Sequence, residues 1–234
     1  MNKHIVTHKV NERLLSLDFL RGLIMVALMI GETGFFQKLF RAYPNSFTEV
    51  LSIQFEHSEW HGLTFWDVIL PAFMTMAGTA MAFSYKKQRE SGFTWKQSFL
   101  KVLKRSFWLL FLGILIYSVR DGHLNWQLSN VLTQLAFTTL IAFSVINQPV
   151  WFQFTVTVLC LLIPEILFRF IHIPEFDQPF VEFHNFGSFI NKSLGIHVDI
   201  LHKTNFINFI SSGAHTTWGV MAGQLLFSNR TSNR

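Results

Sequence analysis

Charged residues are scarce in this chain of 234 residues, and their scarcity excludes an ordinary soluble domain. Asp, Glu, Lys and Arg make up only 14% of the sequence, whereas a typical soluble domain carries about 25%. Half of the residues belong to the hydrophobic class. The composition therefore favours a membrane protein.

Cysteine is almost absent as well. The single cysteine, Cys160, lies inside an apolar run, so the chain cannot contain an internal disulfide framework or a cysteine-based metal site. The net charge is +5, but the basic residues gather at the ends of the apolar runs. We therefore expect no binding to nucleic acid.

Long apolar runs are what the sequence has in abundance. About 20 apolar residues span a bilayer core of ~30 Å as a helix. We identify six such stretches: 14–36, 63–85, 99–119, 130–147, 150–172 and 205–227. They predict an all-α fold, a polytopic transmembrane bundle of about six helices, in a single domain over 1–234.

The distribution of Lys and Arg predicts the orientation of this bundle. The loops on one side, starting with the N-terminal tail, hold twelve of these residues, and the loops on the other side hold five. The positive-inside rule places the basic side in the cytoplasm. We therefore expect a cytoplasmic N-terminus and no cleaved signal peptide, with the 37–62 loop facing the opposite side.

Ionisable residues inside the predicted helices are candidates for function, because each costs ~2.5–3.5 kcal/mol to insert into a membrane. Asp18 and Arg21 are three residues apart in the first stretch, so they share one helix face. They predict either a structural ion pair or an anion site for a cofactor phosphate at the cytoplasmic side.

Glu32, His57 and Asp67 are predicted to lie at one level near the outer surface. Glu32 is ~27 Å along the first helix, and Asp67 lies near the start of the second. A histidine beside a carboxylate is the usual arrangement of a positioned general base. The alternative is a hydrogen-bonded cluster at the membrane interface.

His57 and His61 are four residues apart, a spacing that can bind zinc on a helix. This would suggest a metal-dependent membrane hydrolase. The glutamates nearby match neither the zincin pattern nor its inverse, so we predict no metal.

Two segments resemble the heparan-alpha-glucosaminide N-acetyltransferase family and its bacterial relatives. The run from Arg13 to Gly22 is similar to the start of that family. The run from His57 to Gly78, HSEWHGLTFWDVILPAFMTMAG, is similar to its most characteristic stretch.

The resemblance implies an acyltransferase that moves an acetyl group from cytoplasmic acetyl-CoA, as co-substrate, to an amino-sugar or glycan acceptor across the membrane. It implies that His57 is the active-site residue, either as base or as carrier of the acetyl group, and that Asp67 orients it. We expect Asp18, Arg21 and Arg105 to contact acetyl-CoA. The resemblance also implies the inner (plasma) membrane of a bacterium, with lipid and a second copy of the chain as candidate partners.

The chain departs from the family at two points. Glu32 stands where the lysosomal members have asparagine, so the group that stabilises the oxyanion is unassigned. Family members have about ten or more helices, so we expect the domain to be incomplete at its C-terminus. The alternative function is a non-enzymatic membrane protein: a transporter half, an assembly subunit or an inactive remnant.

Overall fold

The computed structural model describes residues 15–58, 62–124, 126, 128, 130–179, 181–196 and 205–232, and this part of the chain contains helices and no strands. The helices are α1 (Leu15–Glu32), α2 (Phe35–Ala42), α3 (Ser46–Gln54), α4 (Phe65–Glu90), α5 (Trp95–Asp121), α6 (Val131–Ser144), α7 (Val150–Phe170), α8 (Phe186–Ser193) and α9 (Asn208–Ser232). The prediction of an all-α fold is confirmed.

Each of the six predicted apolar stretches coincides with most of one of the longer helices, although α4, α5 and α9 extend beyond their stretches. The helices differ in whether they could span a membrane. Among the described residues, α4 and α7 are long and apolar enough to cross a membrane. α1 and α2 would supply a third span if they are counted as one helix bent by 52°. α6 has 14 residues, or ~21 Å of helix, which is less than a bilayer core.

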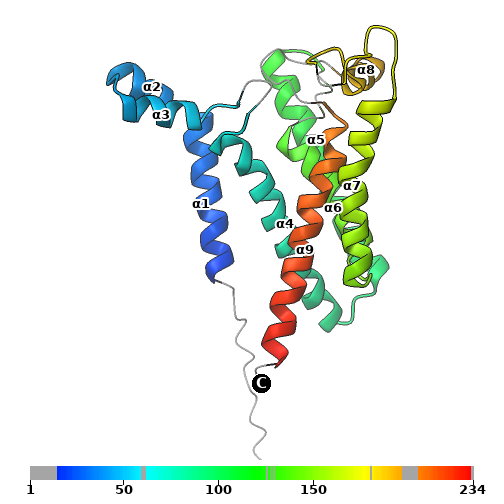
Figure 1. Ribbon diagram of the computed structural model, residues 1–234. Coiled ribbons are helices and arrows are strands. Elements are labelled where there is room, and N and C mark those ends of the chain that lie inside the picture. The colour runs from blue at the N-terminus through cyan, green and yellow to red at the C-terminus, as the bar shows by residue number, and fades with distance from the viewer. Residues whose placement is uncertain are drawn as a thin grey trace, which may run out of the picture.

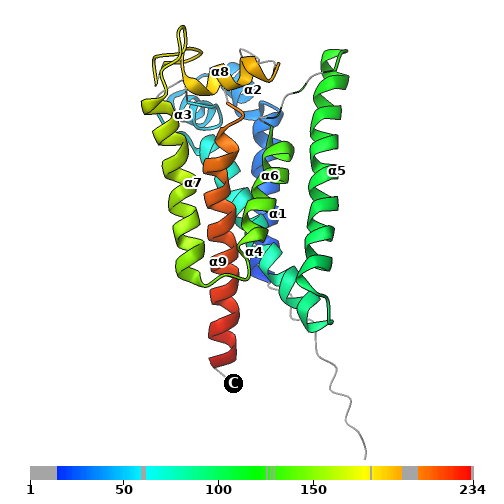
Figure 2. The same ribbon diagram turned by 90° about the vertical axis from the view of Figure 1, so that its right-hand side faces the viewer.

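α9 lies among three of the other long helices (Figure 1). α9 packs against α4, α6 and α7, whereas α5 packs against α6, and α1 packs against α4. Figure 2 shows α5 standing at one side of the bundle. α1 and α5 therefore pack on different helices of the bundle.

Glycines bring the backbones of α4 and α9 into close contact. A Cβ atom on Gly78 of α4 would lie 2.0 Å from the carbonyl oxygen of Thr216, and one on Gly219 of α9 would lie 2.0 Å from that of Thr75. The hydroxyl of Thr79 donates to the Gly219 carbonyl at 3.0 Å. Small residues let membrane helices approach in this way.

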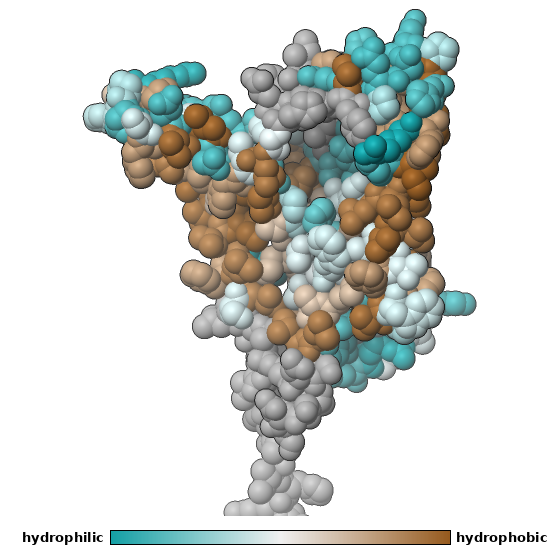
Figure 3. All heavy atoms as spheres, viewed as in Figure 1, coloured by the Kyte–Doolittle hydropathy of each residue, from teal (hydrophilic) through white to brown (hydrophobic). Residues whose placement is uncertain are grey.

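Apolar side chains cover the outside of the bundle along its length. Phe19 and Met29 on α1 are 72% and 69% exposed, and Phe170 on α7 is 74% exposed. Figure 3 shows hydrophobic surface over α1 and α7, with hydrophilic residues towards the ends. Such a surface is unfavourable in water and suits an integral membrane protein.

Two of the connections between the long helices contain helical residues of their own. The basic stretch 86–105 is divided between the end of α4, a turn at 91–94 and the start of α5. The turn contains Gly92 at φ +84°, a conformation that glycine adopts without strain. The 37–62 loop contains the helices α2 and α3, and the latter is capped by Asn45, which accepts hydrogen bonds from the backbone of Phe47 and Thr48.

The described part of the 173–204 connection packs on the long helices through aromatic side chains. Phe186 of α8 contacts Phe168 of α7, with 6.5 Å between ring centroids. Three buried asparagines, Asn185, Asn191 and Asn205, are joined by side-chain hydrogen bonds of 3.2 Å. The connection, α2, α3 and the start of α4 all lie at the same end of the molecule (Figure 1).

Candidate functional site

His57 and Asp67 form a hydrogen-bonded pair at this end of the bundle. His57 follows α3, and Asp67 lies in the first turn of α4. The Nδ1 atom of His57 is 2.8 Å from Oδ1 of Asp67. The side chain of His57 is 63% exposed and that of Asp67 is 24% exposed, so the imidazole is accessible while its carboxylate partner is largely covered.

The position of the Asp67 carboxylate is fixed by the N-terminus of α4. Its Oδ2 atom accepts hydrogen bonds from the backbone N–H of Ser58 at 3.2 Å and from the backbone N–H and hydroxyl of Thr64 at 3.0 Å. Asp67 is the third residue of the helix, where a carboxylate satisfies free backbone donors and is favoured by the helix dipole. These contacts leave Oδ1 directed at His57.

Trp66 contacts the other side of the imidazole. Its indole N–H donates to Nε2 of His57 at 3.1 Å. Because an indole can only donate, Nε2 must be the acceptor, and the ring proton is then on Nδ1, facing Asp67. No local pattern marked Trp66 as part of a site, because a tryptophan near the end of an apolar helix is typical of membrane interfaces.

Glu32 ends α1 at the same end of the molecule, as its position in the sequence suggested. Its side chain is exposed, and among the described residues its carboxylate forms no hydrogen bond or ion pair. The structure therefore brings Glu32 to the level of His57 and Asp67 but not into contact with them. His61, the second residue of the metal alternative, lies outside the described residues, and the described ones contain no cluster of metal-ligating side chains.

The three residues expected at acetyl-CoA are exposed and do not converge. Asp18 and Arg21 lie in the first part of α1 without an ion pair between them or to any other described residue. The structural ion pair is therefore not formed. Arg105 lies on α5, which packs against α6, whereas α1 packs against α4.

A cavity of about 260 Å³ lies at the end of α4 opposite to Asp67. Basic and polar side chains line much of it: Tyr85, Lys86, Arg89, Asn147 and Gln224. The hydroxyl of Tyr85 donates to Oδ1 of Asn147 at 2.8 Å, and the Gln224 amide donates to the Ile146 carbonyl at 2.8 Å. The two cations at the cavity, Lys86 and Arg89, suit an anionic ligand.

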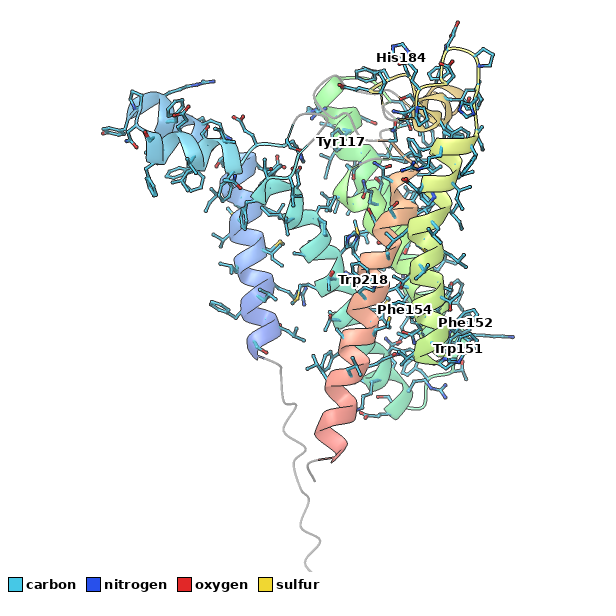
Figure 4. The ribbon with its side chains drawn as sticks, viewed as in Figure 1. Tyr117, Trp151, Phe152, Phe154, His184 and Trp218 are labelled. Carbon is cyan, nitrogen blue, oxygen red and sulfur yellow. The ribbon has the colours of Figure 1, made fainter. Side chains whose placement is uncertain are left out.

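The other described histidines have structural surroundings. The ring of His215 on α9 contacts that of Trp218, with centroids 5.2 Å apart, and Trp218 lies midway along the bundle (Figure 4). His184, above α8 in the same figure, is exposed, and its Nδ1 is 3.4 Å from the carbonyl oxygen of Glu175.

Comparison with known proteins gives one informative similarity. No family model matches the chain. The chain is similar to heparan-alpha-glucosaminide N-acetyltransferase of Mus musculus, with 32% identity over 89 residues. The match covers 36% of this chain and 14% of the mouse protein, so the chain spans only a small part of that relative. The similarity is to the family whose motifs the sequence resembles.

Proposed function

We propose that this protein is a membrane-bound acyltransferase in which His57 is the reacting group. The observation that carries the proposal is the accessible imidazole of His57, which is hydrogen-bonded to Asp67 at 2.8 Å. The similarity to a named N-acetyltransferase supports the same chemistry. The donor is acetyl-CoA, and the acceptor is an amino sugar or glycan on the other side of the membrane.

The Nε2 atom of His57 supports two routes. In direct transfer, Nε2 takes a proton from the acceptor amine or hydroxyl while its nitrogen or oxygen attacks the thioester carbonyl, and the coenzyme A thiolate leaves. In the covalent route, Nε2 attacks the carbonyl first and the coenzyme A thiolate leaves. The acceptor then attacks acetyl-histidine, the bond from Nε2 to the acetyl group breaks, and Nε2 takes the acceptor's proton. In both routes Asp67 accepts a hydrogen bond from the Nδ1–H group and stabilises the positive charge on the ring.

Glu32 is the proposed third member of the site. It ends α1 at the same level as His57. A carboxyl group can donate to a developing oxyanion only in its protonated form, so the proposal assigns Glu32 this role in that form. A change of conformation has to bring it to the imidazole.

The donor is proposed to bind at the opposite end, on the cytoplasmic side. The cavity beside Lys86 and Arg89 supports this placement, because basic groups attract the phosphates of coenzyme A. Asp18, Arg21 and Arg105 are proposed to assist at the same side of the bundle. We also propose that the chain lies in a bacterial inner membrane with its N-terminus in the cytoplasm. There it contacts lipid and pairs with a second copy of the chain.

The test is acetyl transfer by the reconstituted full chain. Liposomes containing the protein receive labelled acetyl-CoA and glucosamine, and labelled product is counted for wild type, His57→Ala and His172→Ala. His172 is also exposed and serves as the matched control. We expect His57→Ala to lower the rate by about 10²–10⁴-fold, the usual contribution of a general base, and His172→Ala to leave it unchanged. Equal transfer by all three would remove His57 from the reaction, and no transfer by the folded wild type would favour a non-enzymatic membrane protein.

A further inference from the structure

Both ring nitrogens of His57 are occupied in the structure. Nδ1 carries the proton directed at Asp67, and Nε2 accepts the hydrogen bond from Trp66 at 3.1 Å. The unprotonated nitrogen of an imidazole has a single lone pair in the ring plane. While the indole N–H uses that lone pair, Nε2 can neither accept a proton from another group nor attack a carbonyl carbon.

The indole lies against His57 in a notch on α1, which is the space left by the missing side chain of Gly31. A Cβ atom on Gly31 would lie 1.8 Å from Cζ3 of Trp66, so the six-membered part of the indole occupies the space that a side chain would take. The ring of Phe55 lies on another side, with 6.4 Å between centroids. Trp66 also belongs to the apolar contact between α1 and α4, with Ile24 and Ile69.

We propose that Trp66 caps the Nε2 atom of His57 in the resting protein and that a substrate has to displace the indole before the imidazole reacts. Trp66 is thus a positioning residue, and Gly31 is the residue that makes room for it. The side chain of His57 is 63% exposed, so the hydrogen bond, rather than burial, limits its reactivity. The effect of the cap on catalysis rests on the proposed function. The hydrogen bond that forms the cap is tested without acyl transfer.

The test uses the reaction of His57 with diethyl pyrocarbonate on the full chain in detergent. The unprotonated Nε2 attacks a carbonyl carbon of the reagent, a nitrogen–carbon bond forms, and ethyl carbonate leaves. Mass spectrometry of the peptide containing His57 follows the rate. The exposed His172 in the same sample reports the effective reagent concentration.

Two variants remove the cap in different ways. Trp66→Phe keeps an aromatic ring in the notch but loses the N–H donor, and Gly31→Ala keeps the donor but pushes the indole away. We expect His57 to react about five-fold faster in both, the ratio that corresponds to one ordinary hydrogen bond. Trp151→Phe, an exposed tryptophan on α7, is the matched control and leaves the rate unchanged.

An unchanged or slower reaction of His57 in Trp66→Phe overturns the cap, even where Gly31→Ala reacts faster, because loosened packing alone would then explain the result. If the protein transfers acetyl groups, Trp66→Phe also lowers the KM for the substrate that displaces the indole while kcat is kept. A protein without transfer activity but with the faster modification contradicts the proposed function and leaves the cap in place.

Discussion

One oxygen of the Asp67 carboxylate faces the N-terminus of α4, and the other faces the imidazole of His57. Oδ2 accepts three donors from Ser58 and Thr64, whereas Oδ1 faces His57. The same side chain therefore begins α4 and orients the imidazole. Because the capping contacts fix the carboxylate, the histidine is held by a group that cannot rotate freely.

Asp67→Asn should preserve the fold at this point but reverse the tautomer of His57. The amide oxygen has to remain on the capping side, where three donors point, so the NH₂ group faces Nδ1. The ring proton then moves to Nε2, where it meets the N–H of Trp66. We expect the acetyl-transfer rate to fall by about 10⁴-fold, as in serine proteases with the same substitution.

Initial rates and ¹⁵N NMR of His57 measure this effect together. Glu49→Gln on α3 is the control, since Glu49 is an exposed carboxylate at the same end. A rate for Asp67→Asn close to that of wild type would contradict the orienting role. Equal losses in the two variants would assign the effect to charge rather than to the tautomer.

At the scale of helices, α4 and α9 approach until backbone meets backbone. This contact joins Gly78 to Thr216 and Gly219 to Thr75, so it holds together segments that are far apart in the chain. Membrane helices gain stability from such van der Waals contact, since lipid gives no hydrophobic drive to association. α1, in contrast, has a glycine, Gly22, with no atom within 4 Å of its would-be Cβ.

Gly78→Ala and Gly22→Ala should therefore have opposite effects on stability. Alanine favours a helix over glycine by ~1 kcal/mol, and Gly22→Ala should gain up to that amount. Gly78→Ala has to push a carbonyl away, an overpacking that costs about 1–3 kcal/mol. Denaturant unfolding in detergent, followed by circular dichroism, gives both changes, and a stabilised Gly78→Ala would contradict the packing described here.

Across the whole molecule, the candidate site and the basic cavity lie at opposite ends. His57 and Asp67 lie at the start of α4, and Lys86 and Arg89 lie at its end. α4 has 26 residues, or ~39 Å of helix, which is sufficient to cross a bilayer core. The proposed transfer needs these ends to face different sides of the membrane.

Labelling with an impermeant maleimide tests that requirement. In a Cys160→Ser background, Ser46→Cys places a thiol at the exposed first residue of α3, and Ser91→Cys places one in the exposed turn after α4. We expect reagent added to intact cells to label the Ser46→Cys protein, and to label the Ser91→Cys protein only after the membrane is permeabilised. Labelling of both from outside, or the reverse pattern, would contradict the proposed orientation.

The amino-acid sequence by itself determined the class of this protein and the neighbourhood of its site. Apolar runs are local features, so they predicted the six long helices, although they did not show which are long and apolar enough to span a membrane. Helix positions in the sequence also predicted that Glu32, His57 and Asp67 lie at one level, and the family resemblance implied that Asp67 orients His57. The structure forms the pair of His57 and Asp67 and leaves Glu32 outside it.

Only the tertiary structure decided which distant residues meet. The cap on Nε2 requires the notch at Gly31 on another helix, and the cavity combines the end of α4 with Asn147 and Gln224. The sequence also grouped Asp18 with Arg21 by helical spacing, yet both side chains point to the surface without pairing. Contacts of this kind depend on how helices pack, which leaves no periodic pattern in the residues of either helix.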